Sequence, residues 1–242
     1  VFAIIEQIAP DVVCIDSPPA WALTGKSRTA ERALRPLGIT AFSTPMNPGD
    51  HPFYRWMRVG MALFQRVSDH YPSYRKGPIH NTALEVFPEA SATLLTGRLC
   101  PKGQKIPFRR AVLRAHGIDD SSLPNLDAVD AALAALTGLR ALDGQFTAVG
   151  DPAEGIIVVP VAPLPAAPLT RAPQNADVPS ASGESALRAS NANLAGEGRL
   201  RSTVESSESL TSNLRLCECG CGAPVSRRFL PGHDAKLKSR LL

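Results

Sequence analysis

Residues 1–160 alternate between helical patterns and short apolar runs, which leaves few fold classes open. Short runs of apolar residues occur at residues 12–15 and 82–87. Apolar residues recur at helical spacing, or helix formers dominate, in five segments: residues 1–8, 52–68, 88–96, 107–116 and 125–142. Because strands that alternate with helices form sheets covered by helices, we expect an α/β fold. Residues 150–160 are expected to close it with a turn and a last short strand.

Acidic residues accompany both apolar runs, and another lies on the apolar face of a helix. Asp16 ends the first run and Glu85 lies in the second. At about 100° per residue, Asp130 lies about 40° from Leu126, inside the apolar stripe of the 125–142 helix. An unpaired carboxylate there would cost several kcal/mol. Asp130 therefore needs a cation, a metal ion or a raised pKa.

Carboxylates gathered at one place suit phosphodiester chemistry with two metal ions. Mg²⁺ and Mn²⁺ prefer carboxylate oxygens and keep open positions for water and phosphate. We expect Asp16, Glu85 and Asp130 to be the ligands. Alternatives exist: Asp16 could accept hydrogen bonds within its own turn, and Glu85 could face solvent. Asp127 follows the expected helix cap Asn125 by two residues, so it either complements the helix dipole or adds a fourth acid.

Basic residues near these acids form two clusters that could contact a phosphate backbone. Their members are Arg28, Arg32 and Arg35, at helical spacing, and Lys102 with Lys105. The favoured interpretation of the neighbouring Arg109, Arg110 and Arg114 is a solvated helix face.

The aromatic residues of the 52–68 helix have two candidate roles. Phe53, Tyr54 and Trp56 could stack on nucleobases or fill the core, and we predict a core role for them.

Five segments together carry a family resemblance over about residues 1–160. They read IDSPPAW, SRTAERALRPLG, EVFPEA, LDAVDAALAAL and GDPAEGIIVVP. In that order they resemble the family called domain of unknown function 429, predicted nucleases of RNase H-like fold. The resemblance implies metal-dependent hydrolysis of nucleic acid, with Asp16, Glu85 and Asp130 as the acidic site. Asp127 matches a further acidic or histidine position of that family.

The start of the chain departs from the resemblance. Related folds begin with three antiparallel strands, the first of which supplies another aspartate, and nothing before residue 12 corresponds to them. We expect the domain over residues 1–160 to lack these strands here, and an upstream segment to supply them. A nucleic-acid-binding protein with this fold but no hydrolytic activity is the alternative function.

Residues 161–242 differ in composition from the first 160. Residues 161–214 are rich in Pro, Ala, Ser and Asn and lack sustained periodicity, which predicts a disordered linker. Residues 215–242 are rich in cysteine and suit a small zinc-binding tail. The expected zinc ligands are Cys217, Cys219, Cys221 and His233, with Asp234 as a substitute for one of them.

Net charge is concentrated in this tail. The formal net charge of the chain is +4. Residues 1–160 are nearly balanced, with 16 basic and 15 acidic groups, whereas the last 28 residues have six basic and two acidic groups. Such a field attracts nucleic acid, although a charged run is also an ordinary solvated surface. The expected nucleic-acid contacts of the tail are Arg227, Arg228, Lys236 and Lys238.

Cysteine usage and hydropathy limit the expected location. The five cysteines show no disulfide framework, which favours the reducing cytoplasm. No apolar run approaches the ~20 residues of a membrane-spanning helix, so no membrane partner is expected.

Overall fold

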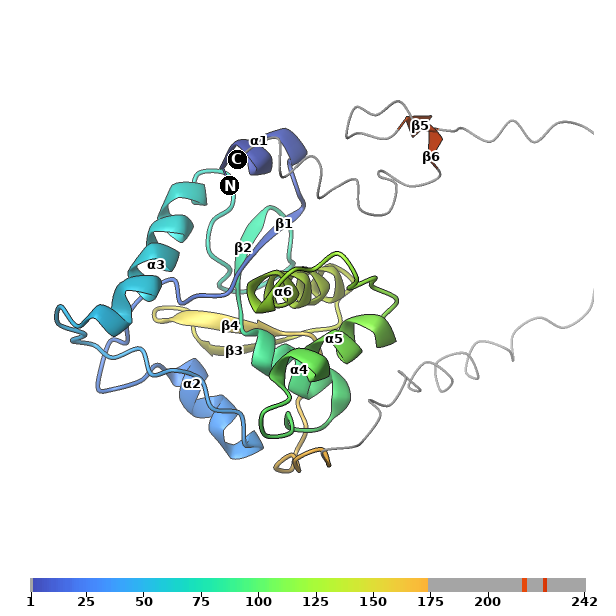
Figure 1. The fold of residues 1–242 in the computed structure, drawn as a ribbon. Helices are drawn as coiled ribbons and strands as arrows, with labels where there is room; N and C mark the ends of the chain where they lie inside the picture. The colour runs from blue at the N-terminus through green and yellow to red at the C-terminus, as the bar shows by residue number, and fades with distance from the viewer. Residues whose placement is uncertain (1, 174–214, 217–223, 226–242) are drawn as a thin grey trace, which may run out of the picture. The chain divides into compact units, whose positions relative to one another are not determined.

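The computed structural model describes residues 2–173, 215–216 and 224–225 (Figure 1). The chain divides into two units, Val1–Ala181 and Ser182–Leu242. The first unit contains a four-stranded sheet in the order β1-β2-β4-β3. Its strands are β1 (Val12–Ile15), β2 (Thr82–Val86), β3 (Thr147–Asp151) and β4 (Gly155–Val159).

Helices connect and cover these strands. They are α1 (Phe2–Ile8), α2 (Thr29–Leu34), α3 (Arg55–Val67), α4 (Pro88–Thr96), α5 (Lys105–Ala115) and α6 (Leu126–Leu142). Two short 3₁₀ helices, η1 (Arg35–Leu37) and η2 (Pro52–Tyr54), flank the connection between α2 and α3.

The pairing of the strands makes this a mixed sheet. β1 is parallel to β2, β2 is parallel to β4, and β3 is antiparallel to β4. In the register, Ile15 lies beside Glu85, which lies beside Ile157. Because β1, β2 and β4 are parallel, their carboxyl ends meet at one edge of the sheet. Asp16, directly after β1, is therefore brought near Glu85.

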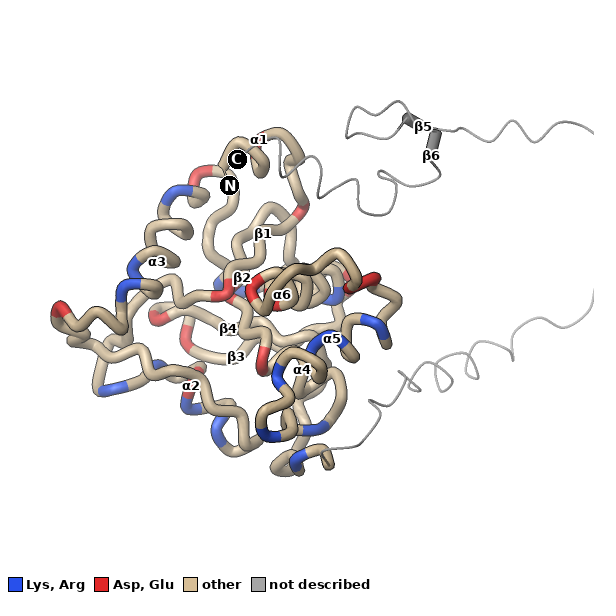
Figure 2. Tube along the Cα trace, in the orientation of Figure 1, with Lys and Arg blue, Asp and Glu red and all other residues tan. Residues whose placement is uncertain are grey.

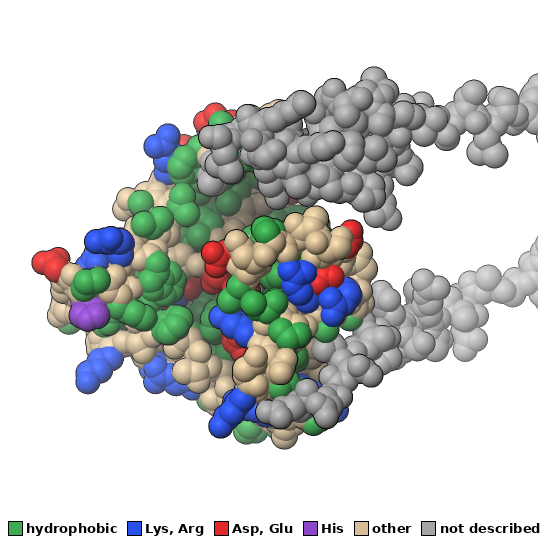
Figure 3. Space-filling view, viewed as in Figure 1, with side chains coloured by type: hydrophobic (Ala, Val, Ile, Leu, Met, Phe, Trp, Pro, Cys, Tyr) green, Lys and Arg blue, Asp and Glu red, His purple; other side chains and the backbone are tan. Residues whose placement is uncertain are grey.

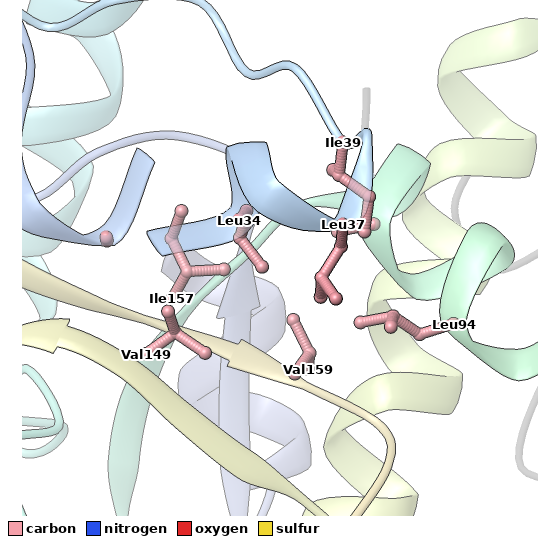
Figure 4. Packing of buried hydrophobic residues seen from close by; sticks show 9 residues of the cluster. Leu34, Leu37, Ile39, Leu94, Val149, Ile157 and Val159 are labelled. Atoms are coloured by element: carbon pink, nitrogen blue, oxygen red, sulfur yellow. The ribbon is translucent and has the colours of Figure 1, made fainter. Parts of the chain in front are cut away.

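Alternate residues of the strands pack into different layers, as the period of a strand requires. Val149, Ile157 and Val159 pack with Leu34 and Leu37, at α2 and η1 (Figure 4). The opposite face of the sheet carries a second cluster, and α6 contributes to it. Its members include Leu84, Val86, Ile156, Val158, Ala134 and Ala141. The sheet is thus covered on both faces, as expected for an α/β fold.

The α6 helix matches its predicted limits. Asn125 caps it by accepting a hydrogen bond from the Ala128 amide at 2.9 Å. Val129, Leu133 and Leu136 are buried against α4 and α5, which confirms the predicted apolar stripe.

The C-terminal part of the sheet differs from its prediction. Residues 147–151 form β3, and only a turn and one strand were expected from residue 150 onward. β3 is an edge strand in which Val149 alone is buried, so it lacks the apolar run by which β1 and β2 were recognised.

The first residues of the expected linker pack on the domain, so a linker beginning at residue 161 is wrong for this part. Val161, Leu164 and Leu169 contact the cluster at α2. The Leu99 amide donates to the Thr170 carbonyl at 2.9 Å, and the Ala172 amide donates to the Leu99 carbonyl at 2.9 Å. Apolar side chains within a proline-rich sequence explain the difference. Residues 174–214 lie outside the described residues.

The second unit is described only at two short strands. β5 (Arg215–Leu216) pairs antiparallel with β6 (Pro224–Val225). The remaining predicted tail residues lie outside the described part of the chain. They are Cys217, Cys219, Cys221, His233 and Asp234, with Arg227, Arg228, Lys236 and Lys238. In the described part of the chain, no helix has the length and hydropathy needed to cross a membrane.

Candidate functional site

A pocket of about 340 Å³ lies at the carboxyl ends of β1 and β2. Asp16, Glu85 and Asp130 all line it, as do Arg28, Lys105 and Arg109. Acidic and basic positions gather around β2 and the start of α6, and the space-filling view shows a hollow between α3 and α6 (Figures 2 and 3). The three acids predicted from the sequence therefore belong to one pocket.

Glu85 is buried in an ion pair with Arg28. Arg28 Nη1 donates to Glu85 Oε2 at 2.7 Å, and Arg28 Nη2 donates to Oε1 at 2.5 Å. Arg28 Nε donates to Glu31 Oε1 at 3.0 Å. The three residues are only 2% to 5% exposed. Because both Glu85 oxygens accept from the guanidinium, Glu85 is held in a fixed orientation.

Burial and the neighbouring charges shift the pKa values of Arg28 and Glu85 in opposite directions. Burial lowers the pKa of Arg28, but the carboxylates of Glu85 and Glu31 outweigh burial and raise it. Burial raises the pKa of Glu85, and Arg28 opposes that rise. The predicted contact of Arg28 with a solvated phosphate backbone is therefore corrected: its guanidinium serves two buried carboxylates.

Room for the Arg28 guanidinium depends on Gly155. A Cβ at this position would lie 2.8 Å from Arg28 Nη1 and 2.5 Å from Pro19 Cγ. Its φ of +103° also favours glycine.

Glu154 fixes the loop that carries Arg28. Its carboxylate accepts from the Thr29 amide at 2.8 Å, the Thr29 hydroxyl at 2.9 Å and the Leu23 amide at 2.9 Å. Burial raises the pKa of Glu154, but these hydrogen bonds outweigh it and lower the pKa. Sequence reasoning missed this role, because the partners are 125 and 131 residues away along the chain.

Asp130 is paired with Arg109. The guanidinium donates to Asp130 Oδ1 through Nη1 and to Glu89 Oε2 at 2.6 Å through Nη2. Burial raises the pKa of Asp130, and Arg109 opposes the rise. Of the expected alternatives of a cation, a metal ion or a raised pKa, Asp130 has a cationic partner and a raised pKa here. The solvated helix face predicted for Arg109 is wrong, because Arg109 is 2% exposed.

The pKa of Asp16 is raised above the ordinary value of an aspartate. Removal of water by the pocket walls, followed by the charge of Asp130, raises its pKa to about 6. Arg109 and Lys105 oppose the rise. Asp16 and Asp130 thus repel each other electrostatically, and a cation between them would relieve that repulsion.

Asp127 stands apart from the other three acids. It lies in the first turn of α6, is exposed, and is not part of the pocket lining. Its position fits the helix-dipole role better than a place among the pocket acids.

The other residues predicted to contact phosphate in this domain lie on the surface. Arg32, Arg35, Lys102 and Lys105 are exposed, and of these Lys105 lines the pocket. Arg32 is partly engaged, because it donates to the Ser27 carbonyl and, at 2.9 Å, to the Thr29 hydroxyl. Lys105 is therefore the predicted phosphate contact that the structure brings to the site.

Aromatic residues at the pocket differ from their prediction. Trp56 and Phe53 are 40% and 41% exposed, so a core role for them is wrong. Phe42, which sequence reasoning did not select, is 63% exposed and lines the pocket with Trp56. The helical spacing of residues 52–68 identified the helix but not which side chains face its buried side.

The acids provide a restricted set of metal ligands. Within residues 2–173 and the two short strands, no three His, Cys, Asp or Glu side chains form a group suited to a metal ion. Both Glu85 oxygens are occupied by Arg28. Three carboxylates around two ions therefore do not fit this arrangement. Asp16 and Asp130 fit a single Mg²⁺ or Mn²⁺, since Mg²⁺ commonly takes one or two carboxylates together with substrate phosphate.

Comparison with protein families identifies the domain. A family model described as protein of unknown function (DUF429) matches residues 1–154. The chain belongs to this family. The DUF429 match contains Asp16, Arg28, Glu85, Arg109 and Asp130. The search of curated proteins and the search of solved structures found no match.

Proposed function

We propose that this DUF429 chain is a divalent-metal-dependent nuclease with an RNase H-like fold, which hydrolyses phosphodiester bonds of nucleic acid. The observation that carries the proposal is the convergence of Asp16 and Asp130 with Lys105 on one pocket. The parallel arrangement of β1, β2 and β4, with acids at the ends of β1 and β2, supports the fold assignment.

Asp16 and Asp130 would hold one Mg²⁺ or Mn²⁺ ion. When bound, such an ion supplies Lewis-acid polarisation of the phosphate and lowers the pKa of water. Burial raises the pKa of both acids, and the charge of Asp130 adds to the rise at Asp16. A bound divalent cation would stabilise both carboxylates in their charged form.

The other pocket residues would bind and orient the substrate. Lys105 is exposed and would neutralise a phosphate oxygen. Arg109 holds Asp130 in place, and Glu85 keeps Arg28 fixed in the pocket wall. Both arginines are positioning residues in this proposal.

Cleavage assays test the proposal directly. Labelled single-stranded and duplex DNA and RNA would be incubated with Mn²⁺, Mg²⁺ or EDTA. We expect metal-dependent cleavage that falls at least about 100-fold in Asp16→Asn and Asp130→Asn. Asp143→Asn is the matched control, because Asp143 is an exposed residue at the other end of α6. Cleavage by Asp16→Asn and Asp130→Asn at the rate of the unmodified protein would reject the proposal.

A second candidate function is nucleic-acid binding without hydrolysis. The specific observation in its favour is that Arg28 and Arg109 already satisfy Glu85 and Asp130 without a metal ion. Binding in EDTA together with no cleavage under any metal condition would favour this function.

For the C-terminal tail, we propose one zinc ion bound by Cys217, Cys219, Cys221 and His233. The pairing of β5 with β6 supports it, because this pairing brings the two ends of the segment 217–223 together. Such a fold-back is required if alternate cysteines are to reach one ion at about 2.3 Å. Elemental analysis should find about one zinc per chain, and Cys219→Ser should lose it. Protein purified without chelator and free of zinc would reject the assignment.

A further inference from the structure

A second hollow lies next to the acidic pocket. A cavity of about 270 Å³ shares Phe42, Phe87, Lys105 and Arg109 with the acidic pocket and extends to Arg171. The shared residues place the two cavities next to each other, and together they are called the groove. A ligand that passes over Phe42 and Lys105 would contact both cavities.

The groove has an aromatic rim. Phe42 contacts Phe53 and Trp56 edge to face, with ring centroids 5.4 Å and 6.1 Å apart. These contacts hold the rings in place although all three are at least 40% exposed. Exposed aromatic rings beside a charged pocket are costly to keep in water, and nucleobases stack on such rings.

Positive charge accompanies the rim along the groove. Lys105 lies where the two cavities meet, and Arg171 lies in the second cavity. Both side chains are exposed. Arg171 is held by donation from Nη1 to the Cys100 carbonyl. Aromatic and cationic side chains thus line the same groove, and these are the groups that bind the bases and phosphates of a nucleic-acid strand.

The second cavity also has unpaired polar atoms in its wall. Among the described residues, Thr93 Oγ1 and Arg109 Nε are buried without a hydrogen-bond partner. Both residues line this cavity. Buried donors of this kind normally find a partner, so polar occupancy of the cavity suits them better than an apolar peptide side chain.

We propose that this groove binds single-stranded nucleic acid, with one unpaired base stacked on Phe42, beside Trp56, and adjacent phosphates at Lys105 and Arg171. The choice of nucleic acid as the ligand rests on the proposed nuclease function. The new claim is that the ligand is single-stranded. Duplexes are disfavoured because their bases already stack on one another, and freeing one costs a few kcal/mol.

Tryptophan fluorescence tests the stacking step. The chain has two tryptophans, so Trp21→Phe leaves Trp56 as the only one. In EDTA, where cleavage is blocked, a 12-nucleotide single strand should quench Trp56 emission, and the matching duplex should not. If neither oligonucleotide quenches the emission, the proposal is overturned, and the aromatic rim would instead be a surface for a protein partner.

Fluorescence anisotropy with labelled oligonucleotides gives an independent measurement. Phe42→Ala should weaken single-strand binding about tenfold or more, since stacking on one aromatic ring carries this much affinity. Leu139→Ala is the control, because Leu139 is 58% exposed on α6 and does not line the groove. Unchanged affinity in Phe42→Ala, or equal affinity for duplex and single strand, would overturn the proposal.

The two proposals fail separately. Single-strand binding that depends on Phe42, with no cleavage under any metal condition, would reject the nuclease and keep the groove. Metal-dependent cleavage together with equal affinity for duplex and single strand would keep the nuclease and reject single-strand binding in the groove.

Discussion

Arg28 balances the charge of the acids around it, so its removal has a definite cost. Arg28→Met would leave the buried carboxylates of Glu85 and Glu31 without their partner. Breaking a buried ion pair in this way typically costs about 3–5 kcal/mol of unfolding free energy. We expect a loss of that size in urea denaturation. Arg35→Met, at an exposed neighbouring arginine, should change stability by less than about 0.5 kcal/mol. Equal stability of the two variants would contradict the buried network.

Asp16 is expected to make stability depend on pH in the metal-free protein. Its pKa is about 6 in the folded state and 3.8 in the reference state. The folded state therefore binds this proton more tightly, and stability is lost as pH rises from about 4 to 6. Asp16→Asn removes this dependence. The variant should match the unmodified protein near pH 4 and exceed it at pH 7.

The size of this effect is limited by solvent. Asp16 is more than a third exposed, so screening reduces the gain to roughly 1 kcal/mol or less. Denaturant titrations in EDTA at pH 4, 6 and 7.5 would measure it, with Asp143→Asn as the control. A variant that is less stable than the unmodified protein at pH 7.5 would contradict the repulsion inferred at Asp16.

At the scale of elements, α3 approaches the end of β1 at Gly60. A Cβ on Gly60 would lie 1.8 Å from Ser17 Oγ and 2.2 Å from Ser17 Cβ. Gly60→Ala should therefore destabilise the protein by about 1–3 kcal/mol through overpacking. The higher helix propensity of alanine offsets part of this loss. Thermal unfolding would show a lower Tm.

Rescue by a second substitution identifies the cause. Ser17→Gly removes both close atoms, so the double variant should be more stable than Gly60→Ala alone. Val59→Ala, on the exposed side of the same helix, should have little effect. No rescue by Ser17→Gly would mean that the contact with Ser17 is not the source of the loss.

The sequence predicted elements whose signals are local. The α6 helix has its cap, its apolar stripe and its end within residues 125–142, and its limits were therefore predictable. β3 has no such signal, because its identity comes from pairing with β4. The three acids of the pocket were found from strand ends and one helix face.

Their partners could not be found in that way. The Arg28–Glu85 pair joins residues 57 positions apart, and the Arg109–Asp130 pair joins residues 21 positions apart. Helical spacing placed Arg28 and Arg109 on helix faces but gave no distance to a carboxylate elsewhere. A periodic pattern predicts which residues share a face, and tertiary contacts decide whether that face meets solvent or another charge.

At the scale of the whole molecule, the domain extends past residue 160. Val161, Leu164 and Leu169 pack on the cluster at α2, and the Thr147 hydroxyl donates to the Val161 carbonyl at 2.6 Å. Removing residues 161–242 should therefore cost roughly 2–4 kcal/mol, since three partly buried apolar side chains are lost. A chain ending at residue 173 keeps these contacts and should unfold at the same urea concentration as the full chain. Equal midpoints for the chains ending at residues 160 and 173 would contradict this boundary, because the packed segment would then add nothing to the stability of the sheet and helices before it.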